Sequence, residues 1–350
     1  MGAWGTWAKG AALVCLWGFA QGVWASVAAT AAELALRGAG ATFPAPLYKK
    51  WIEVYGKQNP RVAITYEAVG SGEGIRRFLA EQVDFAGSDA ALSDEQIAQV
   101  ARGVRMIPVT AGLVVLAYNL PGLTGPLKLS REAYVDILAG RIRRWNDPRI
   151  QATNPHLTLP NLGITLVARL DSSGTTFALT NHLSAVSAEW RDRGPGAAKV
   201  VDWPGNAMRV PYNEGVASRI KLSEGSIGYV EYGFAKRLGL PMAWLQNKAG
   251  QFVEPNDDSG QEALSSHPAP WPENLRLFIP DPGGAGSYPI VTFTWLLLYG
   301  HYPDPERAAQ LKRFVAWGLD SGQTYGRELG YIPLAPELAA QCRAALEEVR

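Results

Sequence analysis

Apolar residues follow two alternating patterns along most of the chain. Short runs of β-branched and aliphatic residues predict strands, at 62–69, 83–87, 113–118, 164–169, 225–230 and 289–298. Apolar positions at helical spacing predict helices between them, at 47–57, 75–81, 134–144, 176–186 and 232–238, with two more after residue 298. Strands that alternate with helices in this way predict an α/β fold with mainly parallel strand pairing.

Two further stretches refine this picture. Residues 106–119 hold two apolar runs, of which 113–118 is the better strand. The segment 247–289 is rich in Gly, Pro, Asp and Ser, and we expect it to be irregular.

The first forty residues have a different pattern, which predicts a signal peptide over 1–25. Lys9 gives a positively charged start, and 11–20 is an apolar run too short to span a bilayer comfortably. Small residues near Ala25 suit signal peptidase, so we expect a mature N-terminus between residues 26 and 33. An uncleaved anchor helix is the alternative. Cys15 follows a valine rather than a small residue, so we expect no lipid anchor.

Length alone favours two domains of ordinary size. The 350 residues are 47% hydrophobic and include 12 Trp, which is enough for a sizeable core. The net charge is +1, from 33 basic and 32 acidic residues without long runs of either sign, which argues against nucleic acid as a partner. After signal cleavage only Cys342 would remain, so we expect no intrachain disulfide.

Three segments repeat one physical device, in which a turn of small and hydroxyl residues leads into a helix. They are 40–44, 70–74 and 171–175. The first N–H groups of a helix lack internal partners and lie at the positive end of its dipole. A single turn of this kind is best interpreted as an ordinary helix cap, but several directed at one point would surround a small tetrahedral anion with donors.

Arg169 and Asp171 add charge to the third of these turns. Their i,i+2 spacing at a strand end places both side chains on one face. The carboxylate could orient a guanidinium that forks onto an anion. A surface ion pair is the alternative.

Taken together, these motifs resemble the PstS family of phosphate-binding proteins. The resemblance rests on the segments 38–48, 83–89, 171–175 and 227–232, and it extends to Tyr331 and the C-terminal helix. It implies a two-lobed periplasmic-binding-protein fold of type II with the ligand in the cleft between the lobes. The implied division is lobe I at 34–109 plus 287–350, lobe II at 112–283, and crossover strands near 109–113 and 284–290.

The resemblance also implies a phosphate site. Carried over residue by residue, it comprises Thr42, Phe43, Ser71, Asp89, Arg169, Asp171, Ser173, Gly174 and Thr175. Two positions depart from the family pattern. Glu73 stands where a small residue is usual, and 203–214 is shorter and less glycine-rich than the family loop, which affects the rim of the site.

The function implied is capture of inorganic phosphate outside the inner membrane, by an exported, soluble periplasmic monomer. Its partners would be the PstC and PstA permeases and the PstB ATPase of an ABC importer. We expect no cofactor and no catalytic or metal site, because the chain has no Gly-x-Ser-x-Gly motif and its histidines are isolated. These are His156, His182, His267 and His301. Specificity for arsenate or sulfate, and the phosphatase or adhesin roles of some exported relatives, stay open as alternatives.

Overall fold

Two sheets lie in the part of the chain that the computed structural model describes, residues 34–205, 207–267 and 271–350. The strands are β1 (Leu34–Gly40), β2 (Val62–Ala68), β3 (Phe85–Ser88), β4 (Val104–Tyr118), β5 (Lys128–Leu129), β6 (Thr165–Arg169), β7 (Met208–Val210), β8 (Ser226–Glu231), β9 (Trp244–Gln246), β10 (Phe252–Val253) and β11 (Val291–Tyr299). The larger sheet has the order β2-β1-β3-β11-β4-β8-β6-β7, and the smaller one the order β10-β9-β5.

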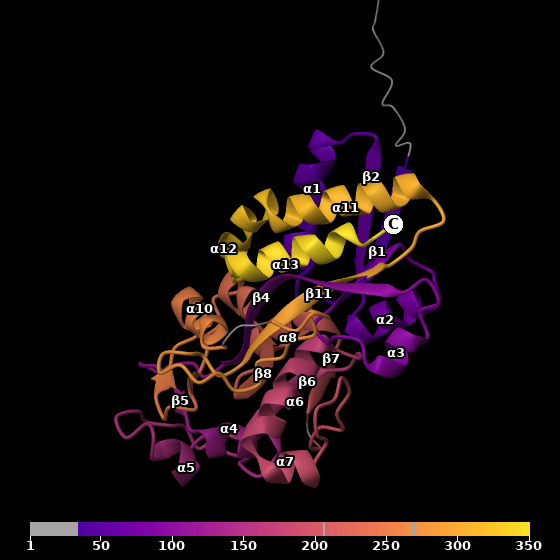
Figure 1. The fold of residues 1–350 in the computed structure, drawn as a ribbon. Helices are drawn as coiled ribbons and strands as arrows, with labels where there is room; N and C mark the ends of the chain where they lie inside the picture. The colour runs from indigo at the N-terminus through magenta and orange to yellow at the C-terminus, as the bar shows by residue number, and fades with distance from the viewer. Residues whose placement is uncertain (1–33, 206, 268–270) are drawn as a thin grey trace, which may run out of the picture. The chain divides into compact units, whose positions relative to one another are not determined.

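Helices flank both ends of the larger sheet (Figure 1). They are α1 (Ala45–Gln58), α2 (Ser71–Leu79), α3 (Asp94–Ala98), α4 (Arg131–Leu138), α5 (Pro148–Gln151), α6 (Gly174–Val186), α7 (Ala188–Asp192), α8 (Tyr212–Leu222), α9 (Tyr232–Arg237), α10 (Asp257–Ser265), α11 (Pro305–Leu319), α12 (Gly326–Leu329) and α13 (Pro336–Glu347), with a 3-10 helix at Ser321–Tyr325. Helices α1 and α11 pack against β2 and β1, whereas α6 packs against β8. None of the helices in the described residues has the length and apolarity needed to cross a bilayer.

One long strand, β4, belongs to both halves of the larger sheet. Its first part pairs with β11, and its last five residues, Val114 to Tyr118, pair with β8. The two apolar runs in this region therefore form a single strand rather than one good strand and a weaker neighbour. The register with β11 shifts beside Pro108, which has no N–H to donate and is accommodated at such an irregularity.

Strand direction differs from the prediction in the centre of the sheet. Strand β1 runs parallel to β2 and β3, and β6 runs parallel to β7 and β8. Between these clusters, β11 is antiparallel to β3 and β4, and β4 is antiparallel to β8. The prediction of mainly parallel pairing is wrong for these central strands, because apolar runs locate strands but do not specify their direction.

Two local predictions also need correction. The predicted helix at 134–144 is displaced, because α4 starts after Ser130, whose Oγ caps it, and ends before Gly140, which has φ 72°. The segment 247–289 is not wholly irregular, since it contains β10 and α10. Asn256 and Ser259 form a capping box that starts α10.

The core follows the predicted apolar faces. In α1, Leu47, Trp51 and Tyr55 lie at helical spacing and are buried. The indole N–H of Trp51 donates to the carbonyl of Gly322 at 2.8 Å, which fastens α1 to the 3-10 helix.

The predicted signal peptide lies outside the described residues. The lobe boundaries stay a prediction, although residues 284–290 form no strand and the chain enters β11 only at Val291.

Candidate functional site

The C-terminal ends of four strands supply the predicted site residues. Because β1, β2 and β3 are parallel neighbours, the chain leaves all three at the same edge of the sheet. Thr42 and Phe43 follow β1, Ser71 opens α2 after β2, and Asp89 follows β3. Arg169 is the last residue of β6, and the loop after it leads into α6. The sequence order of these motifs therefore becomes a spatial cluster.

The start of α6 touches the residues that follow β2 and β3. A Cβ added to Gly174 would lie 2.3 Å from Ser71 Oγ and 2.7 Å from Asp89 Oδ2, distances that no real Cβ atom tolerates. The backbone N–H of Asp89 donates to Ser71 Oγ at 3.1 Å. Glycine at position 174 is thus required by the close approach of two segments that are far apart in sequence.

A second contact joins α2 to the loop before α6. The N–H of Gly72 donates to the carbonyl of Ser172 at 2.9 Å. Gly70 has φ 91°, in the left-handed region that favours glycine. A Cβ at this position would also lie 2.4 Å from Asp171 Oδ2. The 70–74 and 171–175 turns therefore face each other directly.

Arg169 and Asp171 form a bidentate ion pair. Arg169 Nε donates to Asp171 Oδ1 at 2.8 Å, and Nη2 donates to Oδ2 at 2.5 Å. The side chain of Arg169 is 1% exposed and that of Asp171 is 15% exposed, so the alternative of a surface ion pair is wrong. The remaining guanidinium nitrogen, Nη1, donates to Thr175 Oγ1 at 3.3 Å. The predicted orientation of the guanidinium by the carboxylate is confirmed.

Thr42 and Thr175 share one partner, the side chain of Asn213. Its Nδ2 donates to Thr42 Oγ1 at 2.9 Å and to Thr175 Oγ1 at 3.1 Å. Phe43, next to Thr42, accepts a 2.6 Å hydrogen bond on its carbonyl from the hydroxyl of Tyr331. All five of these residues are buried.

The hydroxyl groups at the three turns do not all cap helices. At α6, Ser173 Oγ accepts from the N–H of Thr176 at 3.0 Å, so this turn is also a helix cap. Helices α1 and α2 have no side-chain cap, so Thr42 and Ser71 serve no such role. The N–H groups of Gly174 and Thr175, in the first turn of α6, have no partner within the helix.

Asp89 is an acid in a buried position, 1% exposed. Its Oδ1 accepts a hydrogen bond from Thr294 Oγ1 at 2.9 Å. Burial raises the pKa of Asp89 to about 7, although the hydrogen bond from Thr294 and the charge of Arg169 act in the opposite direction. Near neutral pH this carboxyl group can therefore either donate or accept a hydrogen bond.

Comparison with known proteins decides the family. The sequence profile of the PBP superfamily domain matches residues 25–321. Phosphate-binding protein PstS of Pasteurella multocida is 38% identical over 325 residues, which is 92% of both chains. PstS of Methanocaldococcus jannaschii is 36% identical over 326 residues, 87% of this chain and 83% of that one. The chain belongs to the PstS family.

Solved structures of similar fold agree with this assignment. A high-affinity periplasmic phosphate-binding protein with bound phosphate has a TM-score of 0.72 at 21% identity, covering 88% of this chain and 93% of that one. A phosphate-binding protein from Stenotrophomonas maltophilia has a TM-score of 0.71 at 20% identity, covering 89% and 93%. The predicted two-lobed periplasmic-binding-protein fold is confirmed. The role of the nine predicted residues in binding stays a prediction.

Glu73, one of the two departures from the PstS pattern, has its charge compensated locally. Its carboxylate accepts hydrogen bonds from Arg76 Nε at 2.7 Å and from Arg77 Nε at 2.8 Å. These two contacts lower the pKa of Glu73 to about 2, and the hydrogen bond from Arg76 has the larger effect. Glu73 therefore adds an ion pair on α2 rather than an uncompensated charge beside the site.

The second departure from the PstS pattern, 203–214, contains Asn213, a residue of the cluster that the sequence analysis did not predict. Asn213 lies in the first turn of α8, and its side chain lies at the centre of the cluster rather than at the rim. A signal was present, because Val216, Ala217 and Ile220 have helical spacing and are buried. An asparagine at the start of that pattern would have marked a helix N-terminus.

The histidines do not contribute to this cluster. His182 is buried between the hydroxyl of Tyr134, at 2.9 Å, and the carbonyl of Pro280, at 2.6 Å. Burial lowers the pKa of His182 to about 4, which keeps it neutral and structural. Across the described residues, no group of three or more His, Cys, Asp or Glu side chains is placed to hold a metal ion.

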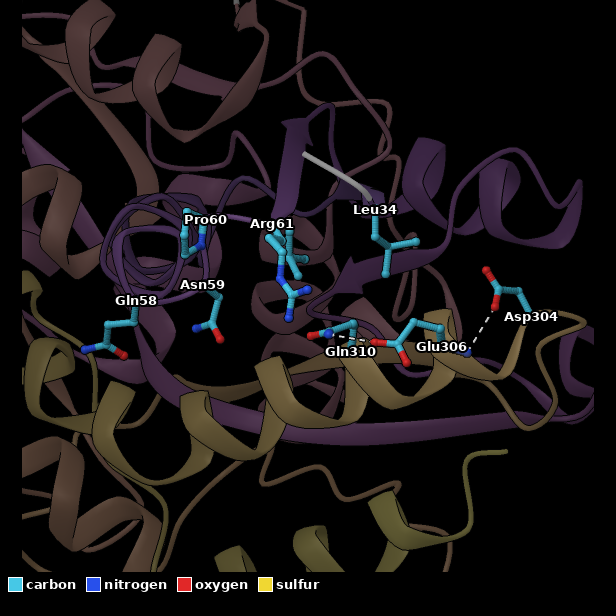
Figure 2. Close-up of a pocket in the computed structure, with 9 residues that line it drawn as sticks. Leu34, Gln58, Asn59, Pro60, Arg61, Asp304, Glu306 and Gln310 are labelled. Atoms are coloured by element: carbon cyan, nitrogen blue, oxygen red, sulfur yellow. Dashed lines mark hydrogen bonds between the residues drawn. The ribbon is translucent and has the colours of Figure 1, made fainter. Parts of the chain in front are cut away.

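A separate cavity of about 590 Å³ lies at the opposite ends of β1 and β2 (Figure 2). It is lined in part by Leu34 and Val62, the first residues of those strands. On its α11 side, Gln310 donates to Glu306 at 2.8 Å, and the N–H of Glu306 donates to Asp304 at 3.0 Å. These polar groups already bind one another, and we assign the cavity no role in ligand binding.

Proposed function

We propose that this protein binds inorganic phosphate with high affinity outside the inner membrane and delivers it to an ABC transporter for import. The observation that carries the proposal is a single buried cluster that contains hydroxyl donors, helix N-terminal N–H groups, an oriented guanidinium and one carboxyl group of raised pKa. Membership of the PstS family, whose named members are phosphate-binding proteins, supports the same ligand.

Each part of the cluster suits a protonated tetrahedral oxyanion. Arg169 supplies a fixed positive charge, with Asp171 holding it in place. The first turn of α6 and the hydroxyls of Thr42 and Ser71 supply neutral donors. Asp89 supplies an acceptor for the one feature that separates phosphate from sulfate near neutral pH, an O–H group. We therefore propose all nine predicted residues, Phe43 through its backbone N–H, as the phosphate site.

A binding role is favoured over an enzymatic one. A phosphatase would need a nucleophile with a general base, or a metal centre. The buried groups of this cluster are instead paired with each other, as Arg169 is with Asp171. Release of phosphate from a chromogenic ester, measured with and without chelator, would reveal a phosphatase.

Isothermal titration with phosphate, arsenate and sulfate tests the proposed ligand. We expect tight binding of phosphate, and no binding of sulfate at concentrations that saturate with phosphate. Sulfate binding equal to that of phosphate would overturn the proposal and would favour a different oxyanion. Arsenate has the same shape and protonation chemistry as phosphate, so only its relative affinity is informative.

We further propose two lobes, I (34–109 plus 287–350) and II (112–283), that close on the ligand, and delivery to PstC and PstA permeases coupled to the PstB ATPase. The predicted signal peptide at 1–25 would place the mature protein in the periplasm without a lipid anchor. Intact-mass measurement on a periplasmic extract tests this. A mass that includes residues 1–25, or an added lipid mass, would contradict it.

A further inference from the structure

Asn213 makes four hydrogen bonds to residues outside α8, and together they reach three parts of the cluster or its support. Nδ2 donates to Thr42 Oγ1 at 2.9 Å and to Thr175 Oγ1 at 3.1 Å. The backbone N–H donates to Thr42 Oγ1 at 3.3 Å. Oδ1 accepts from the N–H of Glu231 at 3.0 Å. One fully buried side chain thus joins the β1–α1 segment, the first turn of α6 and the end of β8.

The orientation of this amide is determined by its partners. The N–H of Glu231 can only donate, so the atom that faces it must be the acceptor Oδ1. Nδ2 must therefore face the two threonine hydroxyls, and both of its protons are used there.

The same bonds determine which way the two hydroxyl protons point. Thr42 Oγ1 accepts from the N–H and from Nδ2 of Asn213. Thr175 Oγ1 accepts from Asn213 Nδ2 and from Arg169 Nη1. A hydroxyl oxygen has two acceptor sites and one proton. With both acceptor sites occupied by groups that cannot accept, each hydroxyl can only donate its proton elsewhere, and an anion among these groups would receive both.

The backbone that carries Asn213 is held in a conformation that its sequence disfavours. Tyr212 has φ 65°, in the left-handed region that bulky residues rarely adopt. Its N–H donates to Asp171 Oδ1 at 3.0 Å, directly before the bond from Asn213 to Thr42. Strain of this kind persists where surrounding contacts over-determine the geometry, and it clusters at functional sites.

We propose that Asn213 is a positioning residue that makes the Thr42 and Thr175 hydroxyls obligate donors to the bound anion. The inference rests on the proposed phosphate-binding function and names a residue outside the predicted set of nine. Asn213 contacts no ligand in this account, because its amide acts only through the two hydroxyl groups. Its effect on binding should therefore depend on those hydroxyls being present.

A double-mutant cycle tests this dependence. Phosphate affinity is measured by isothermal titration for the parent, Asn213→Ala, Thr42→Val/Thr175→Val, and the triple variant. A hydrogen bond to a charged group is worth roughly a tenfold to hundredfold change in affinity, and Asn213→Ala should weaken phosphate binding within that range. In the Thr42→Val/Thr175→Val background the same change should cost less than roughly threefold. An equal loss in both backgrounds would overturn the proposal.

Asn213→Asp provides a variant that leaves no cavity. It keeps an acceptor for the N–H of Glu231 but replaces the donor with an acceptor, so each hydroxyl proton turns toward the new carboxylate. Its loss of affinity should exceed that of Asn213→Ala, and the excess should shrink in the Thr42→Val/Thr175→Val background. An excess of the same size in both backgrounds would mean simple charge repulsion and would contradict the proposal.

Asn154→Ala is the matched control. Asn154 is also fully buried, and its Nδ2 bonds the carbonyls of Lys128 and Ile150, away from the cluster. The Asn154→Ala substitution should lower the melting temperature without changing phosphate affinity. It therefore separates a general loss of stability from the loss of hydroxyl positioning expected for Asn213→Ala. If the parent itself fails to bind phosphate, the proposed function fails. If the parent binds and Asn213→Ala binds equally well, only the role of Asn213 is overturned.

Discussion

Arg169 and Asp171 form a bidentate ion pair. The side chain of Arg169 is only 1% exposed, so water is excluded from the guanidinium group. Arg169→Ala should weaken phosphate binding by about 3–5 kcal/mol, because it removes the fixed positive charge and leaves the carboxylate of Asp171 without its partner. Titration calorimetry of the folded variant measures this. A loss below about 1 kcal/mol would place Arg169 outside the binding contacts.

Arg209→Ala is the control for that experiment. Arg209 pairs with Asp202, but the two side chains are 42% and 96% exposed. An exposed pair of this kind contributes about 0–1 kcal/mol, so phosphate affinity should be unchanged.

Gly174→Ala should prevent the two turns from meeting. The added Cβ would lie 2.3 Å from Ser71 Oγ and 2.7 Å from Asp89 Cβ, so the segments must separate. We expect weaker phosphate binding and, by small-angle scattering at saturating phosphate, a larger radius of gyration than the parent. Gly56→Ala, in the interior of α1 with nothing within 4 Å of the new Cβ, should instead stabilise the fold by about 1 kcal/mol and leave binding unchanged.

Local sequence signals predicted the parts of the site that depend on strand ends. Each motif follows an apolar run, and parallel strands bring their C-terminal ends to one edge, so Ser71 and Asp89 could be placed near each other from the pattern. The Arg169–Asp171 pair needed only i,i+2 spacing. The family resemblance supplied the ligand and the grouping of the nine residues.

The contacts that could not be predicted from the sequence depend on packing between residues far apart in the chain. Asn213 reaches Thr42 across 171 positions, and Thr294 reaches Asp89 across 205. Neither pairing has a periodicity or spacing signal. The antiparallel strands in the centre of the sheet were missed for a related reason, since strand direction is set by how distant segments connect. The helix α10 was missed because its Gly and Asp residues are also frequent in loops.

Asp89 should stabilise the unliganded protein less and less as pH rises from about 4 to 7. Burial raises the pKa of Asp89 to about 7, above its unfolded value near 3.9, so in this range the folded state binds more protons than the unfolded state. The stabilisation is complete below the unfolded pKa and is lost as pH rises through the folded one. Glu231, buried with a pKa raised to about 8, acts in the same direction. His182 acts in the opposite direction, because burial lowers its pKa to about 4.

Asp89→Asn should remove this contribution, so the free energy of unfolding should fall less, or rise more, between pH 5 and pH 8 in the variant than in the parent. The amide oxygen can still accept from Thr294, but the variant has no acid at this position to titrate. Urea unfolding at pH 5, 6, 7 and 8 without phosphate measures the slope. Asp202→Asn, at a side chain that is 96% exposed, should leave the slope as in the parent. Identical slopes for Asp89→Asn and the parent would show that Asp89 titrates alike in both states.

Sulfate exclusion should depend on Asp89 and on pH. Near neutral pH phosphate carries at least one proton and sulfate carries none, so a deprotonated Asp89 can accept from phosphate but meets a bare anionic oxygen of sulfate. Sites that pair a substrate O–H reject the analogue without it by roughly 10⁴–10⁵-fold, because a buried charge stays unsatisfied. Below its pKa of about 7, a protonated Asp89 can donate to sulfate, so exclusion should weaken as pH falls.

Asp89→Asn should narrow the gap between the two anions mainly above pH 7, where the parent's Asp89 is deprotonated, because the amide can donate to sulfate and still accept from phosphate. Competition of sulfate against labelled phosphate at pH 5.5 and 8.5, for the parent and the variant, measures both effects. The parent should admit sulfate better at pH 5.5 than at pH 8.5, and the variant should show a smaller difference. If the variant excludes sulfate as completely as the parent at pH 8.5, Asp89 is not the group that discriminates between the two anions.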